Sequence, residues 1–176
     1  RGQVLVKISG APKILPVEIR ALSGGLWKGR VEMPSPLAAE EILFPEGKKL
    51  PVVRFQGISH VIWEEEMPAK EEAERLVRKW CRILSADALG LLFLDRETSR
   101  LTPLVYVPGS GTSFWEHSCA SGSSSAGMYL SDKTAAPAEL ILREPGGMLR
   151  VCSNPLSRET WLYGHVRWQG AYTICL

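Results

Sequence analysis

The chain has 176 residues, of which 45% are hydrophobic and 23% are charged. This size and balance are typical of one large or two small folded domains, and they exclude an intrinsically disordered chain and a membrane protein. Lysine and arginine number 21 against 19 acidic residues, so the net charge of +2 leaves no basic stripe for nucleic acid. The four cysteines form no CxxC pair, which argues against a zinc site and a disulfide framework and indicates a cytoplasmic protein. No glycine-rich segment has the spacing of a phosphate- or dinucleotide-binding loop, so no cofactor is expected. The start at Arg1 and Gly2, without methionine, predicts an excised or processed piece.

Short apolar and alternating runs predict strands through the first part of the chain. These predicted strands span residues 4–8, 14–19, 26–33, 52–55 and 60–63. The segment from Pro34 to Pro51 contains four prolines and is predicted to be mostly loop. An amphipathic helix is predicted from about Ala69 to Leu84, because its apolar residues recur at helical spacing.

The second part of the chain is also rich in predicted strands. Residues 88–94 are nearly all apolar, which predicts a strand buried on both faces, and further strands are predicted at 101–107, 160–168 and 172–175. Residues 138–143 and 148–151 predict a hairpin, with a type II turn at Pro145 and Gly146. Many short strands, few helices and no strand–helix–strand alternation predict an α+β fold with a curved, mostly antiparallel sheet.

The segment from Pro108 to Leu130 is rich in glycine and serine, but aromatic and apolar residues bound it on both sides. We therefore predict a strand ending near Ser118, a turn, and a buried helix from about Ser121 to Ser131, rather than a flexible linker. Cys119 then stands just before a helix N-terminus, where free amides and the helix dipole favour a thiolate and bind anions such as a carboxylate. A thiolate beside a bound carboxylate suggests proton removal from the carbon next to that carboxylate.

The stretch from Glu116 to Ser123, with Ala126 following, resembles the second active-site segment of the diaminopimelate epimerase-like superfamily. Three further stretches resemble family motifs in the same order, and they are Val31–Pro36, Gly57–Val61 and Pro145–Val151. The resemblance implies a curved antiparallel sheet or barrel wrapped around a central helix, in one of two similar halves. It also implies racemase or epimerase chemistry without pyridoxal phosphate, in which one cysteine from each half exchanges the α-proton.

Only one cysteine motif of this family is present, so residues 1–176 are expected to be a single domain similar to the C-terminal half of a two-domain epimerase. The N-terminal half would be missing, the chain alone would be inactive, and its bare cleft face around Cys119, His60 and Trp115 would promote self-association. No nucleic acid or membrane partner is expected, and the substrate is expected to be a small amino acid.

The resemblance assigns Cys119 as the catalytic acid/base. It suggests that His60 lines the cleft and contacts the substrate, and that Ala120, Ser121 and Gly122 act through their backbone amides. Glu116 is expected to contact the substrate or tune the thiol, and His117 is an alternative for tuning the thiol. Glu116 and His117 should point to opposite faces of a strand, so only one of them can face the cleft.

Two departures from the family pattern disfavour diaminopimelate as the substrate. Ser110-Gly111 stands where the diaminopimelate enzymes carry a Glu-Arg pair, and Ile58-Ser59 replaces the Asn-Pro before His60. Another amino acid, such as histidine, is a better candidate. The alternatives are an isomerase of the phenazine-biosynthesis or proline-racemase type, and a non-catalytic module that binds carboxylates.

Overall fold

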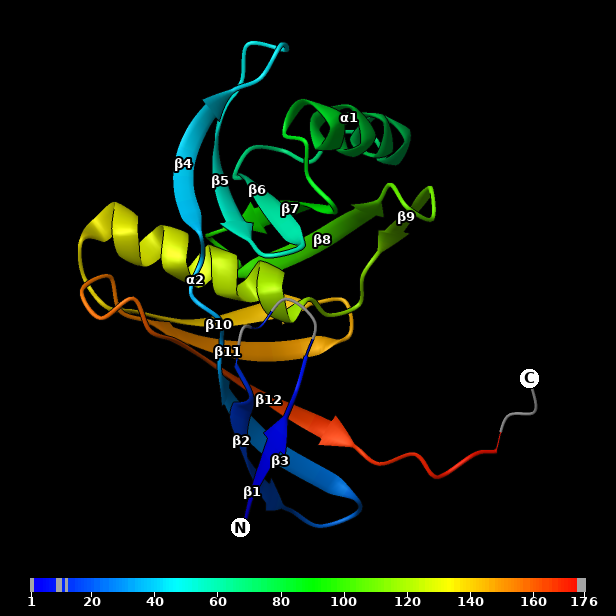
Figure 1. Ribbon diagram of the computed structural model, residues 1–176, viewed down its shortest axis with the longest axis vertical. Helices are drawn as coiled ribbons and strands as arrows, with labels where there is room; N and C mark the ends of the chain where they lie inside the picture. Colours follow the sequence, from blue (N-terminus) through cyan, green and yellow to red (C-terminus); the bar gives the residue numbers. More distant parts are fainter. Residues whose placement is uncertain (1, 9–10, 12, 174–176) are drawn as a thin grey trace.

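The computed structural model describes residues 2–8, 11 and 13–173, which form mostly sheet with two helices (Figure 1). The strands are β1 (Gly2–Val6), β2 (Leu15–Ala21), β3 (Leu26–Glu32), β4 (Ala38–Leu43), β5 (Lys49–Phe55), β6 (Ile58–Trp63), β7 (Leu89–Asp95), β8 (Arg100–Val107), β9 (Thr112–Trp115), β10 (Ala138–Glu144), β11 (Gly147–Ser153) and β12 (Thr160–Arg167). The helices are α1 (Lys70–Ile83) and α2 (Ala120–Thr134). Neither helix is long and apolar enough to cross a membrane.

The strands form one twelve-stranded sheet with two sections. Its order is β1-β2-β3-β12-β11-β10-β8-β7-β6-β5-β4, and β9 pairs with β8. The sections meet at β10 and β8, where a single residue pair, Arg143 with Arg100, is in register. Strands β1 and β4 stand at the two ends of the order, so the described strands do not close into a barrel.

Most strand pairs are antiparallel, as predicted, but β6 pairs with β7 in parallel. Helix α1 connects these two strands, and residues 58–95 therefore form a strand–helix–strand unit. The expectation that the chain contains no such unit was wrong. Its elements were all predicted, since the helix near residues 69–84 stands between the predicted strands 60–63 and 88–94.

Two hydrophobic cores lie on opposite faces of the section β4–β8. Neighbouring residues of one strand alternate between them, because successive side chains in a strand point to opposite faces. Val61 and Leu91 pack beneath α1, whereas Ile62 and Leu92 pack in the core that contains α2. Strand β7 is thus buried on both faces, which confirms the interpretation of its continuous apolar run.

The segment expected to be loop, Pro34 to Pro51, contains a strand. β4 pairs with β5 from Ala38 to Leu43, at the edge of the sheet. The prolines permit this because they lie outside β4, and Pro51 of β5 precedes the first pair of β5 with β6, Val52 with Val61. The N–H that Pro51 lacks is therefore not needed for that ladder.

Two smaller predictions also failed. The hairpin of β10 and β11 forms, but positive φ is found at Gly147 (146°) rather than at Gly146, so the turn is not type II. The strand expected at 172–175 is not formed at Tyr172 and Thr173, and Ile174 and Cys175 lie outside the described residues.

Helix α2 is buried along most of its length although most of its side chains are small. It packs against β10, β11 and β12 and also against β5, β6 and β7. The hydroxyls of Ser124 and Ser125 donate to the carbonyls of Ala120 and Ser121 one turn earlier, which satisfies them in the dry interior.

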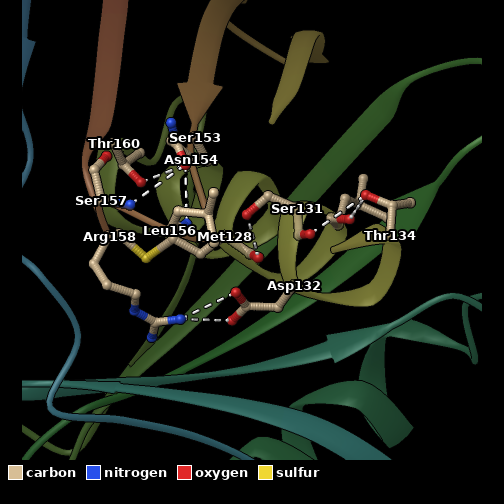
Figure 2. A network of polar contacts seen from close by, with 11 residues as sticks. Met128, Ser131, Asp132, Thr134, Ser153, Asn154, Leu156, Ser157, Arg158 and Thr160 are labelled. Atoms are coloured by element: carbon tan, nitrogen blue, oxygen red, sulfur yellow. Dashed lines mark hydrogen bonds and ion pairs between the residues drawn. The ribbon is translucent and has the colours of Figure 1, made fainter. Parts of the chain in front are cut away.

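The C-terminal end of α2 is tied to the connection between β11 and β12 (Figure 2). Arg158 Nη1 donates to both carboxylate oxygens of Asp132, at 3.0 and 3.1 Å. In the same view, Asn154 Oδ1 accepts from the N–H of Leu156 at 2.9 Å, which shapes the loop that carries Arg158. The helix is thus held at this end by a polar contact between a surface loop and its last turn.

Gly127 sets the distance between α2 and β11. A Cβ at this position would lie 2.5 Å from Val151 Cγ1 and 2.8 Å from Ser153 Oγ. Replacement by alanine should therefore force the helix and the strand apart, even though alanine is the better helix former by about 1 kcal/mol.

We expect Gly127→Ala to lower the free energy of unfolding by about 2 kcal/mol, because overpacking outweighs helix propensity. Denaturant unfolding followed by circular dichroism measures this change. Gly109→Ala is the control, since a Cβ there meets no atom within 4 Å and it should change stability by less than about 0.5 kcal/mol. A Gly127→Ala protein as stable as the unmodified chain would contradict the close approach.

Candidate active site

Cys119 is the N-cap of α2, as the sequence predicted. Its backbone is extended, with φ −129° and ψ 100°, and its Sγ accepts the N–H of Gly122 at 3.4 Å. Its own N–H donates to Glu144 Oε2 at 2.6 Å. Only 6% of the residue is exposed. The thiol thus replaces the oxygen that usually caps a helix N-terminus.

Ser121 links this thiol to His60 on β6. Ser121 Oγ lies 2.9 Å from His60 Nε2 and 3.7 Å from Cys119 Sγ. His60 has no exposed surface, and burial lowers its pKa to about 3, so the imidazole is neutral at physiological pH. The His60 ring reaches the site through Ser121, and its expected contact with the substrate stays a prediction.

A glycine on the neighbouring strand makes room for the His60 ring. His60 pairs with Gly90 of β7, where a Cβ would lie 2.2 Å from His60 Nδ1. That ring nitrogen is buried and has no hydrogen-bond partner within the described part of the chain. The imidazole is consequently held by packing and by its single contact to Ser121.

The thiol of Cys119 is less acidic than that of an ordinary cysteine. Burial raises its pKa to about 12, and the adjacent carboxylate of Glu116 acts in the same direction. The N–H of Gly122 and the hydroxyl of Ser121 lower the pKa, but by less. The prediction of a thiolate was therefore wrong, because removal from water outweighs the helix N-terminus.

Glu116 and His117 point to different surroundings, which agrees with their alternation. Glu116 is half-buried and influences the thiol, whereas His117 is exposed. Strand β9 ends at Trp115, earlier than the predicted end near Ser118. Residues 116–118 thus form a short connection that turns from β9 into α2.

The first turn of α2 only partly fits the expected carboxylate cradle. Ala120 is exposed and Ser121 is half-buried, so the surface reaches the helix tip at these two residues. The N–H groups of a first helical turn have no intrahelical partner. Gly122, however, is buried, and its N–H is taken by Cys119 Sγ. Gly122 therefore contacts the thiol rather than the open surface.

Glu144 is a buried site residue that the sequence analysis missed. It is 7% exposed, and its carboxylate accepts from the N–H of Cys119 and from Ser123 Oγ. Its position just before the Pro145–Gly146 turn gave no periodicity signal. The proximity of residues 119 and 144 arises only when the hairpin folds against the tip of α2.

The other described cysteines lie elsewhere. Cys81 is buried in the core beneath α1, and Cys152 is half-buried on β11. Among the described residues, no three His, Cys, Asp or Glu side chains cluster in a way that could hold a metal ion. The polar groups brought together at the tip of α2 are thus the Cys119 thiol, the carboxyl groups of Glu116 and Glu144, the hydroxyls of Ser121 and Ser123, and the neutral imidazole of His60.

Comparison with known proteins places the chain in a family. Residues 1–167 match the family described as "Histidine racemase CntK N-terminal domain". The chain belongs to this family. Its description names an N-terminal domain, so the prediction of a second-half domain is not confirmed, while the racemase resemblance is.

Curated relatives of this histidine racemase family are longer than the chain. A histidine racemase from Fusobacterium nucleatum is 34% identical over 149 residues, covering 82% of this chain and 55% of that protein. One from Staphylococcus aureus is 30% identical over 82 residues, covering 44% and 30%. The chain spans about half the length of the Fusobacterium relative. In fold it is similar to a predicted epimerase from Pseudomonas aeruginosa, with a TM-score of 0.61 and 13% identity over 97% of this chain and 67% of that one.

The raised pKa of Cys119 predicts slow alkylation. At pH 7 to 9 little thiolate is present, so iodoacetamide should label Cys119 more slowly than it labels the half-buried Cys152, and the rate should still rise with pH at pH 10. Glu116→Gln removes a nearby negative charge and should raise the rate at pH 8 about tenfold. Peptide mapping by mass spectrometry measures both rates. Fast labelling of Cys119 with a midpoint near pH 7 would contradict the burial argument.

Proposed function

We propose that the chain is one half of a cofactor-independent histidine racemase, with Cys119 as one of two groups that exchange the α-proton. The observation that carries this proposal is the thiol at the N-cap of α2, beside the exposed tip formed by Ala120 and Ser121, in a member of the histidine racemase family. Histidine is proposed as substrate because the curated relatives are named histidine racemases.

The helix tip is suited to bind the substrate through its carboxylate. The N–H groups of Ala120 and Ser121 and the helix dipole favour a negative charge there. When the α-proton leaves, negative charge moves onto that same carboxylate, and the amides would stabilise it more strongly in the transition state than in the ground state.

Cys119 is suited to the role of acid. Its pKa of about 12 keeps the proton on sulfur at neutral pH. A base from the other half would remove the α-proton from one face, and the Cys119 S–H would deliver a proton to the opposite face. Reversal of these two transfers returns the first enantiomer. Glu116 would tune the thiol, and His60 would hold Ser121 in place.

Several finer points belong to the same proposal. The sheet sections would wrap around α2 as a central helix, in agreement with the contacts of α2 to both sections. The family description suggests a first half, whereas the motif order suggests a second half. In either case the second acid/base group would come from the other half of the enzyme, consistent with relatives about twice as long.

Besides supplying a group beside Cys119, the other half would dock on an apolar face farther along the sheet. Of the three residues expected to form a bare patch, Cys119 and His60 are buried and Trp115 is half-buried. A row of paired residues instead leads from the covered Val151 through Leu162, Val31 and Val17 to Val4, which is 42% exposed. Strands β1, β2 and β3 lie below α2 in Figure 1, so this end of the apolar sheet face extends beyond the helix.

The same face carries an exposed apolar pair. Trp27 pairs with Val166, and they are 40% and 68% exposed. Between them and the row that contains Val31, the cross-strand pair Gly29 and Gly164 lacks side chains. A Cβ on Gly164 would lie 3.0 Å from Leu149 Cδ2, so this space is filled from within the chain. An apolar element of the other half would instead bury the exposed side chains of Trp27 and Val166.

The activity test uses the complete two-half enzyme in deuterium oxide with L-histidine. We expect D-histidine labelled at the α-carbon, and a loss of rate on the order of a thousandfold in Cys119→Ser, because general acid–base groups contribute about this much. Cys152→Ser is the control and should keep the rate. The 176-residue chain alone should produce no D-histidine. Efficient racemisation by the chain alone would sink the half-enzyme proposal, and an unaffected Cys119→Ser enzyme would sink the role of the thiol.

The docking face is tested by sedimentation of the isolated chain over a concentration series. Exposed apolar patches promote association. We expect self-association in the unmodified chain and a monomer in the double variant Trp27→Lys/Val166→Lys. Leu156→Lys is the matched control, because Leu156 is 90% exposed in a loop outside this face. A chain that stays monomeric at every concentration would contradict the proposal.

A further inference from the structure

Glu144 is a buried carboxyl group without an ion-pair partner among the described residues. Burial raises its pKa, while hydrogen bonds from Ser123, Cys119 and Ser118 lower it. Burying such a group is costly unless its oxygens are hydrogen-bonded. The Glu144 carboxylate and the groups that donate hydrogen bonds to it are therefore expected to fix each other's positions.

All of these contacts go to the start of α2. Oε2 accepts the N–H of Cys119 at 2.6 Å, and Oε1 accepts the hydroxyl of Ser123 in the first turn. Glu144 thus holds the residue that carries the thiol through its backbone, rather than through its sulfur.

The next residues of the same turn hold the other side of the segment. Gly146 N–H donates to the carbonyl of His117 at 2.6 Å. A Cβ on Gly146 would lie 2.9 Å from that carbonyl oxygen, so the contact requires glycine at this position. One bond therefore fixes a carbonyl before Ser118, and the other fixes an N–H after it.

We propose that Glu144 is a positioning residue that, together with the N–H of Gly146, clamps residues 117–119 and so fixes the direction of the Cys119 thiol. One bond is accepted by the His117 carbonyl and the other is donated by the Cys119 N–H. Together they fix the orientation of the two peptide groups on either side of Ser118. The Cys119 backbone then directs Sγ back toward the N–H of Gly122. The inference rests on the proposed function only in treating this thiol as the reacting group.

The clamp is tested in the 176-residue chain by amide hydrogen exchange and by alkylation with iodoacetamide. In the unmodified chain, the amide of Cys119 should exchange at least about tenfold more slowly than those of Ala120 and Ser121, relative to unstructured rates. In Glu144→Ala, both exchange at Cys119 and labelling of Cys119 should become at least about tenfold faster. Glu144→Gln keeps an acceptor oxygen and should preserve the exchange protection within about threefold.

Two references separate the clamp from general loosening. Glu139→Gln makes the same change at an exposed position of β10 and should alter neither rate. Cys81 is buried in the other core, so its labelling rises only if the whole fold loosens. If Glu144→Ala does not fold, Gly146→Ala should give the same selective effect by pushing on the His117 carbonyl.

Three results would overturn the clamp. They are unprotected Cys119 exchange in the unmodified chain, equal loss of protection in Glu144→Gln and Glu144→Ala, or parallel acceleration of Cys81 and Cys119. Neither measurement needs turnover. A complete enzyme without racemase activity would therefore contradict the proposed function and leave the clamp intact.

Discussion

The structure depends on the close approach to the sheet of a helix, α2, whose side chains are mostly small. Helix α2 presents glycine and serine where most buried helices present leucine, and at Gly127 the helix and β11 leave no room for a Cβ. Packing at this distance lets one helix contact strands of both sheet sections. The hydroxyls of Ser124 and Ser125 are tolerated in that interior because they donate to carbonyls one turn earlier, and that of Ser123 donates to Glu144.

The same close packing governs the electrostatics at the tip of the helix. A helix N-terminus and the N–H of Gly122 favour a thiolate at Cys119, but a residue with 6% exposure has lost most of its hydration. Desolvation is the larger effect, and the thiol stays protonated. Burial lowers the pKa of His60, whereas it raises that of Cys119, and the imidazole therefore stays neutral. The interior around the site thus holds both groups in their uncharged forms.

The sequence predicted the elements better than their environments. Helix α1 and strand β7 were found because periodicity and an apolar run are local signals. Strand β4 was missed because the prolines that flank it indicate a loop when the sequence is considered locally, although none of them lies within the strand. At the site, Cys119 was found from its small-residue surroundings. Its pKa and the contact with Glu144 could not be predicted, because both depend on burial and on residues 25 positions apart.

The narrow joint between β10 and β8 has a consequence for how the fold opens. A single registered pair, Arg143 with Arg100, connects the backbone ladders of the two sections. Helix α2 adds contact between them through its packing on both, within a core to which both sections contribute side chains. The backbone ladder is therefore weakest at this joint, and we expect displacement of α2 to let the amides of the two sections exchange at different rates.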